Sequence, residues 1–184
     1  MRKSIPFDDV DQLGPQHVAG KVDVTAEELD CEEVRRIGEV DVDVTVQKGD
    51  IPAEYLVEGS VRFDGELNCA RCLGGMPFAN DSGFAVRYRP RSSEEVQEEE
   101  EHEIHEEELD VEYYDERAVS IHDLAAEQIQ LSIPMKPLCD ENCRGLCPQC
   151  GADLNREKCE CSTESTDARW DALREIREKL NESK

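Results

Sequence analysis

Apolar and polar residues alternate with a period of two through much of the first half of the chain. In residues 39–47 (EVDVDVTVQ), valine occupies each even position, and polar or charged residues fill the odd positions. Residues 55–69 continue this alternation, with the following residues in one register: Tyr55, Val57, Val61, Phe63, Leu67 and Cys69. Such alternation is typical of strands with one buried face. Gly59 and Gly65 fall in the apolar register, so we expect a bend, bulge or turn within the stretch.

A third stretch, residues 83–90 (GFAVRYRP), places Phe84, Val86 and Tyr88 on one face. Proline cannot continue a hydrogen-bonded ladder, so Pro90 should end this strand. The three stretches predict a mostly antiparallel, twisted sheet that curls toward a barrel. With the few helices predicted below, the fold class is α+β, built on a β-rich, barrel-like sheet.

Two helices are predicted in the second half. Ser120 can cap a helix over residues 121–131 (IHDLAAEQIQL), and Pro134 should stop it. This helix has a buried stripe made of Ile121, Leu124, Ala125 and Ile129. Another helix is predicted to start at Thr166 or Asp167 and to run almost to the end, with a narrow apolar stripe of Trp170, Leu173, Ile176 and Leu180.

Composition limits the classes of function. The 184 residues include 45 Asp and Glu against 21 Lys and Arg, a net charge of −24. Fourteen of these acids, and no Lys or Arg, lie in residues 94–116. A chain this acidic is neither a generic basic nucleic-acid coat nor a polybasic membrane binder. No apolar run approaches the roughly 20 residues of a membrane span, and the N-terminus lacks a secretory signal, so we expect a cytoplasmic protein.

The composition and the periodicity together predict four parts. Residues 1–93 form a β-rich domain, and residues 94–110 form a mobile acidic insertion. Residues 111–138 supply a strand and a helix that complete the domain. Residues 139–184 form a cysteine-rich, zinc-ribbon-like module with the C-terminal helix.

Eight of the nine cysteines occur in close pairs, which favours metal binding over disulfides in a reducing compartment. Cys147 and Cys150 form a CxxC turn followed directly by Gly151. The pair Cys159 and Cys161 comes after a loop long enough to return to this turn. Because tetrahedral zinc takes four soft ligands, these four cysteines are predicted to close one site.

The remaining pairs leave two arrangements open. Cys69 and Cys72 can join Cys139 and Cys143 in a second zinc site that ties the sheet to the C-terminal half. Alternatively, one compact cluster uses Cys139, Cys143, Cys147 and Cys150, which leaves Cys69 and Cys72 as a reactive or unmetallated pair. Four-cysteine sites have no open coordination position for water, and no catalytic motif is present. We therefore expect one or two structural zinc ions and no enzymatic activity.

Three segments together resemble the YceD family, the large ribosomal RNA subunit accumulation proteins. They are CARCL at 69–73, IHDLAAEQIQLSIPMKPLC at 121–139 and CRGLCPQCGADLN at 143–155. The resemblance runs from the valine-rich strands to Trp170. It implies a non-enzymatic bacterial or plastid factor linked to accumulation of 23S ribosomal RNA. Some members of the family lack the distal cysteines, which supports two separate sites here.

The partner implied by this resemblance is a ribosomal RNA precursor or a large-subunit ribosomal protein, with no membrane and no small-molecule substrate. Residues 62–91 hold five Arg against three acids. The candidate RNA contacts are Arg62, Arg71, Arg87, Tyr88, Arg89 and Arg91, with Tyr88 offered for base stacking. The other reading of these arginines is a solvated strand face. The acidic segment could instead attract a basic ribosomal protein, and a zinc-ribbon interaction or regulatory module unconnected to ribosomes is the alternative function.

Overall fold

The computed structural model describes residues 4–91 and 111–161. The acidic insertion at 94–110 and the helix predicted from Thr166 lie outside the described residues, so those two predictions stay open. No helix in the described ranges is long and apolar enough to cross a membrane.

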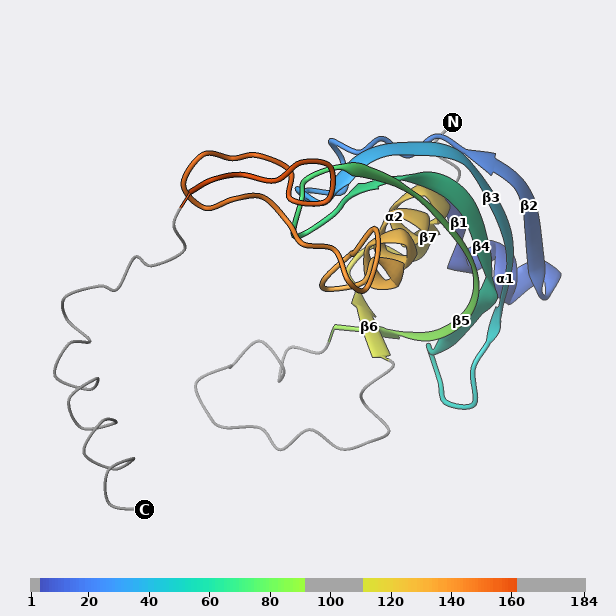
Figure 1. Cartoon of the computed structure of the whole chain (residues 1–184). Helices are drawn as coiled ribbons and strands as arrows, with labels where there is room; N and C mark the ends of the chain where they lie inside the picture. Colours follow the sequence, from blue (N-terminus) through green and yellow to red (C-terminus); the bar gives the residue numbers. More distant parts are fainter. Residues whose placement is uncertain (1–3, 92–110, 162–184) are drawn as a thin grey trace, which may run out of the picture.

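Five strands form the main sheet, in the order β2–β3–β4–β5–β6 (Figure 1). Their bounds are β2 Gln16–Val22, β3 Val34–Lys48, β4 Tyr55–Asn68, β5 Gly75–Pro90 and β6 Val111–Tyr114. Strands β2 to β5 are antiparallel neighbours, as the alternation predicts. β6 adds a short parallel pairing to the last residues of β5. The predicted end of the third stretch at Pro90 is confirmed.

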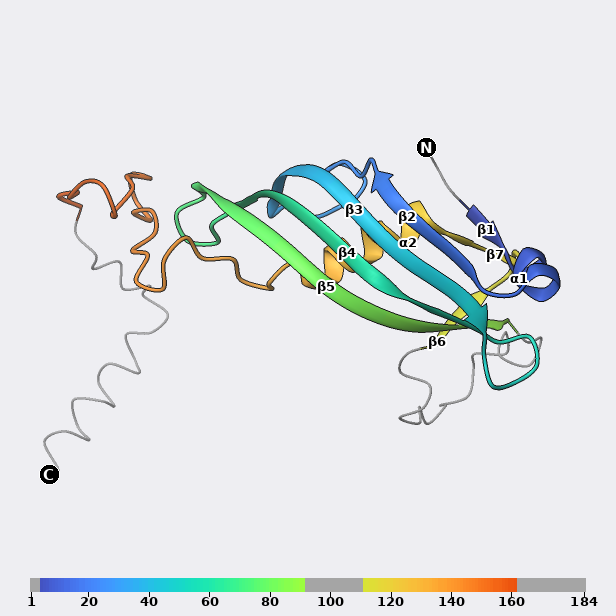
Figure 2. The ribbon, with the colours of Figure 1, turned by 90° about the vertical axis from the view of Figure 1, so that its right-hand side faces the viewer.

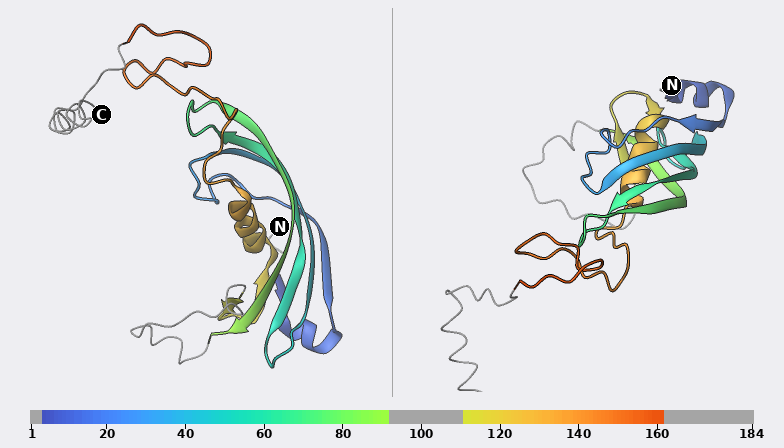
Figure 3. Two further views of the ribbon diagram at one scale, coloured as in Figure 1. Left: turned by 60° about the horizontal axis from the view of Figure 1, so that its bottom comes forward. Right: turned by 45° about the horizontal axis from the view of Figure 1, so that its top comes forward.

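The sheet is strongly curved, but it stays open. β2 forms one edge and β6 the other, and these two strands do not pair within the described ranges. The sheet thus curls as expected, but it does not close into a barrel. In Figures 2 and 3, helix α2 (Ile121–Ser132) lies against the concave face and fills the space that the strands curve around. The helix therefore covers the inner face of the sheet, which in a closed barrel the opposite strands would cover.

Helix α2 follows its sequence signals closely. The backbone N–H of Asp123 donates to the Ser120 hydroxyl at 3.3 Å, which caps the helix. The predicted stripe of Ile121, Leu124, Ala125 and Ile129 is buried, and His122 joins it. The helix ends at Ser132, just before Pro134. Leu29 and the valines of β3 complete the core beneath it.

Two glycines keep β3 and β4 close together. A Cβ atom at Gly59 would lie 2.2 Å from the Asp43 carbonyl oxygen, and one at Gly65 would lie 2.5 Å from that of Arg36. β4 itself runs unbroken from Tyr55 to Asn68. The irregularity expected at these glycines is instead in the partner strand, where the register shifts near Val34 and again before Val40.

A small N-terminal unit closes one end of the core. Strand β1 (Ser4–Pro6) pairs antiparallel with β7 (Ala118–Ser120) and leads into helix α1 (Phe7–Leu13). Phe7 is fully buried and stacks on Tyr55 with ring centroids 4.0 Å apart. Arg117 donates to Asp8, Asp11 and the Tyr55 hydroxyl, so α1 is fastened to the sheet by packing and by charge.

Candidate metal centres

The first group of cysteines begins in the turn between β4 and β5. Cys69 follows directly after β4 and is fully buried, and Cys72 lies three residues further on. The backbone closes the turn twice: Cys69 N–H donates to the Gly74 carbonyl, and Leu73 N–H donates to the Cys69 carbonyl, both at 2.9 Å. The CxxC turn thus presents two sulfur atoms at one end of the long β4–β5 hairpin.

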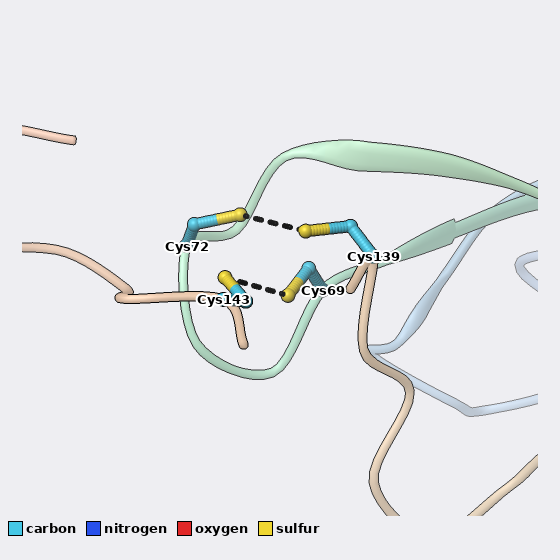
Figure 4. A group of neighbouring side chains, drawn as sticks. All are labelled: Cys69, Cys72, Cys139 and Cys143. Atoms are coloured by element: carbon cyan, nitrogen blue, oxygen red, sulfur yellow. Dashed lines mark hydrogen bonds between the residues drawn. The ribbon is translucent and has the colours of Figure 1, made fainter. Parts of the chain in front are cut away.

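The other half of this group comes from the segment after α2. The backbone N–H of Ala70 donates to the Pro137 carbonyl at 2.8 Å, which brings Cys139 beside the turn. Figure 4 shows the four side chains converging, with Cys69 Sγ 3.8 Å from Cys143 Sγ and Cys72 Sγ 3.7 Å from Cys139 Sγ. Four thiolates about 2.3 Å from one tetrahedral ion would lie about 3.8 Å apart. The spacing therefore suits a shared metal ion and is far too long for disulfides.

The second group is formed by Cys147, Cys150, Cys159 and Cys161, whose ligand atoms all lie within 4.8 Å of one another, as in the first group. Gly151 adopts φ +74° and donates to the Cys147 carbonyl at 2.9 Å, so the chain turns beneath the sulfur atoms. The structure thus assembles the two separate sets of four. The single merged cluster is not the arrangement found.

The electrostatics of each group favour a bound cation. Burial opposes ionisation of Cys69, but backbone N–H groups of Cys139, Cys72 and Arg71 outweigh it and lower its pKa to about 6. Hydrogen bonding to Cys143 raises the pKa of Cys139 to about 12. Cys69 ionises readily while Cys139 holds its proton, because several thiolates cannot share a site without positive charge between them. A metal ion would supply that charge.

The second group repeats this division. Backbone N–H groups of Cys150 and Gln149 lower the pKa of Cys147 to about 6. Hydrogen bonding to Cys150 raises the pKa of Cys161 to about 12. Both groups therefore combine one thiol that ionises near neutrality with another that does so only at high pH.

Two residues outside the cysteine sets hold the groups together. The Arg71 Nη1 atom donates to the carbonyls of Glu141 at 3.0 Å and Cys143 at 2.8 Å. Asn155, which lies between Cys150 and Cys159 of the second group, donates from Nδ2 to Cys143 Sγ at 3.4 Å. Gly145 adopts φ +74° and passes so near the Arg71 carbonyl that a Cβ would lie 3.0 Å from it. The side chains of Arg71 and Asn155 lie in the motif segments quoted above. The spacing of the cysteines alone does not show that these two residues position the first cysteine group.

Four of the five arginines predicted to bind RNA are engaged by other groups of this chain. Arg62 pairs with Asp81 at 2.8 Å, and Arg91 pairs with Asp115 at 3.2 Å. Arg89 pairs at 2.8 Å with Glu54, whose side chain is only 4% exposed. Arg71 is engaged by the first cysteine group, as described above. Among the described residues, Arg87 is the one member of this set with an exposed side chain and no ion pair or side-chain hydrogen bond.

Tyr88 corrects the stacking hypothesis. Only 8% of this residue is exposed, and its ring lies 6.1 Å from that of Phe7 in the core. Burial raises the pKa of its hydroxyl far above the usual value, and nearby Glu127 raises it further. An aromatic ring must present a free face to stack on a base. Tyr88 is thus a core residue and not an RNA contact.

A family model described as large ribosomal RNA subunit accumulation protein YceD matches residues 57–177, a range that includes all eight clustered cysteines. The chain is 37% identical over 54 residues to "Large ribosomal RNA subunit accumulation protein YCED homolog 1, chloroplastic" of Arabidopsis thaliana, which is 29% of this chain and 17% of that protein. It is 31% identical over 141 residues to an uncharacterized protein of Mycobacterium tuberculosis, 74% of this chain and 61% of that protein. The chain thus spans less than two thirds of these relatives. No solved structure matches.

Proposed function

Because the chain belongs to the YceD family, we propose that it is a non-enzymatic factor that supports accumulation of large-subunit (23S) ribosomal RNA during ribosome assembly. It does so by binding the RNA precursor or an assembling ribosomal protein. The observation that carries this proposal is the family match over residues 57–177, which covers β4 from Val57 onward, β5, α2 and both cysteine groups. The cytoplasmic location expected from the sequence forms part of the same proposal.

Each cysteine group is proposed to hold one structural zinc ion. Four thiol ligands at tetrahedral spacing complete the coordination shell and leave no position for a reactive water. The first ion would tie the β4–β5 turn to the segment after α2, and the second would fold the loop from Cys147 to Cys161. Sites of this kind stabilise a fold, which supports a binding role over catalysis.

The charge distribution favours a ribosomal protein as the direct partner. The chain carries a net charge of −24, whereas most large-subunit ribosomal proteins would present Lys and Arg to the RNA they coat. Three of the five candidate arginines are held in ion pairs with this chain's own acids, and Arg71 braces the first cysteine group. Direct RNA binding by the sheet therefore depends on Arg87. Replacing Arg87 by Glu should abolish RNA crosslinking if that contact exists.

Deletion and complementation test the proposed function. A deletion strain should lose 23S relative to 16S ribosomal RNA, and the wild-type chain should restore the ratio. A Cys72→Ser chain, which lacks one ligand of the first centre, should restore it poorly. Cys31→Ser is the matched control because Cys31 lies outside both groups. An unchanged ratio in the deletion strain would reject the ribosomal role and favour an interaction module unconnected to ribosomes.

A further inference from the structure

One long edge of the main sheet is open, in that no other described strand pairs with most of its length. β4 covers one side of β5 from Gly75 to Tyr88, whereas β6 covers the other side only from Arg87 to Pro90. Within the described ranges, no strand and no backbone hydrogen bond occupies that second side between residues 75 and 86. Figure 2 shows β5 running along this margin of the sheet, with the short β6 at one end. The open edge is long enough to pair with another extended segment.

Pro77 shows which backbone groups face outward. Proline has no N–H, and a ladder accommodates it where its nitrogen points away from the neighbouring strand. Pro77 lies opposite Glu66, in a register that continues without a shift to the end of β4. Successive residues of an antiparallel strand alternate between facing the neighbour and facing away. The residues that present N–H and carbonyl groups to the open side are thus Ala79, Asp81, Gly83 and Ala85.

On the concave side of the same edge, incompletely covered apolar residues lie on both sides of Asn80 and Ser82. Phe78, Phe84 and Val86 point to the concave side and pack against the core, but all three remain only half-buried. The corresponding residues of β3 and β4, such as Val44 and Val57, are almost completely buried. An added strand with apolar residues on its inner face would cover the remaining apolar surface of β5.

The convex side next to this edge is acidic. A shallow hollow of about 470 Å³ is lined by Glu39, Asp41, Asp64 and Asp81, with Arg62 as its one basic residue and Ala79 at the open edge. Arg62 pairs with Asp81, and Glu39 pairs with Lys21. Asp41 and Asp64 have no ion pair among the described residues. A long basic side chain on the outer face of an added strand would lie beside Asp81 of β5 and extend toward Asp64 of β4.

The other edge of the sheet is different. β2 is a short strand of seven residues and carries His17 and Lys21 on its exposed face. A short edge strand with charged side chains is protected from pairing with the strand of another chain. β5 is longer than β2, and between residues 75 and 86 its one charged residue is Asp81. The two edges are therefore not equivalent, and β5 is the edge suited to pairing.

We propose that the open edge of β5, from Ala79 to Ala85, binds an extended Lys- or Arg-bearing segment of a basic protein, which adds a strand to the sheet and places a cationic side chain in the acidic hollow. Charge complementarity selects this occupant over RNA, whose phosphates would meet Asp41, Asp64 and Glu39. This inference rests on the proposed function, because it makes an assembling ribosomal protein the direct partner.

Photo-crosslinking tests the contact. Full-length, zinc-loaded chain carrying Ala79→p-benzoylphenylalanine is mixed with purified large-subunit ribosomal proteins or, separately, with protein-free ribosomal RNA. Ala19, an exposed alanine on the opposite edge strand, is the matched control position. The expected result is a crosslink from Ala79, and not from Ala19, to a Lys- or Arg-rich segment of a ribosomal protein. Crosslinks to RNA, to a second copy of the chain, equally from both positions, or to nothing would each overturn the proposal.

Two substitutions separate the edge from the hollow. Ala85→Pro removes one outward N–H while sparing the ladder with β4, and it should lower the crosslink yield about tenfold or more. Asp64→Arg places a cation in the hollow and should have a comparable effect. Asp43→Arg is the control, since it changes the net charge equally on the same convex face but does not line the hollow. Equal yields from all three variants would reject the interface.

Complementation distinguishes this inference from the proposed function. If deletion lowers 23S ribosomal RNA and the Ala85→Pro chain, at unchanged melting temperature, restores it fully, the β5 interface is wrong and the ribosomal role stands. If deletion leaves ribosomal RNA unchanged, the proposed function itself fails, whatever the crosslinks show.

Discussion

The ion pair between Glu54 and Arg89 yields a prediction that also separates a structural role from an RNA-binding role. The Glu54 side chain is 4% exposed, whereas that of Arg89 is 28% exposed. Glu54 accepts from Arg89 Nε at 2.8 Å and from the Asp50 N–H at 3.2 Å. Replacing Arg89 with Met therefore leaves a buried carboxylate with one backbone donor and no counter-charge.

The cost can be bounded from this geometry. Removing one partner of a fully buried pair typically costs about 3–5 kcal/mol. Because Arg89 keeps partial solvent contact and the Asp50 N–H remains, we expect Arg89→Met to lower the free energy of unfolding by about 2–3 kcal/mol. For a chain of this size, that corresponds to a melting temperature lower by about 4–12 °C. The double variant Glu54→Gln/Arg89→Met removes the stranded charge and should recover most of the loss.

Urea unfolding of the zinc-loaded chain measures these differences. The matched control is Arg62→Met, because Arg62 lies on the same sheet but pairs with Asp81 at an exposed site, where such pairs contribute about 0–1 kcal/mol. Equal, small losses for Arg89→Met and Arg62→Met would refute the reasoning from burial. A loss of RNA crosslinking by Arg89→Met without any change in stability would restore Arg89 as an RNA contact.

Three further predictions concern the cysteine groups. Elemental analysis should find about two zinc ions per chain, and about one in Cys72→Ser; no zinc in freshly reduced protein would contradict the metal assignment. Asn155→Ala should weaken binding at the first centre about 10–100-fold in a chelator competition, whereas Arg156→Ala, at an exposed neighbour, should not; equal affinities would deny Asn155 its positioning role. In the metal-free, reduced chain, stability should rise as pH increases from about 6 toward 9, because the lowered pKa values of Cys69 and Cys147 favour the folded state once these thiols ionise. A flat profile, measured against the double serine variant, would show that these backbone hydrogen bonds do not stabilise the thiolates.

Residue pattern predicts the faces of the strands well because one side of the sheet is buried. In β3 and β4 every expected inward residue is buried, since a shift of one residue would expose the whole apolar set. The same alternation places Tyr88 with Phe84 and Val86 on the apolar face. The prediction that Tyr88 stacks on an RNA base therefore conflicted with the pattern itself. Periodicity was the better guide at this position.

Other features depend on contacts that no local pattern contains. Phe7 is buried because Tyr55, far along the chain, stacks on it, and α1 is too short to show a helical period. Closure of a barrel depends on strand number and stagger, and here α2 occupies the concave face instead. Spacing alone grouped Cys147 with Cys161, but the choice between the two arrangements of Cys139 was settled by a tertiary contact, the hydrogen bond from Ala70 to Pro137.

The arrangement of the sheet limits where a partner can bind. The concave face is occupied by α2, whose stripe of Leu124 and Ile129 is buried against the strands. The first cysteine group fixes one end of the β4–β5 hairpin, and the Glu54–Arg89 pair fixes the other end beside β6. Between these two anchors, β4 holds β5 in one continuous register, and no other described strand pairs with its other side between residues 75 and 86. A strand pinned at both ends loses little conformational entropy when a partner pairs with it, so the two anchors prepare this edge for binding without taking part in the contact.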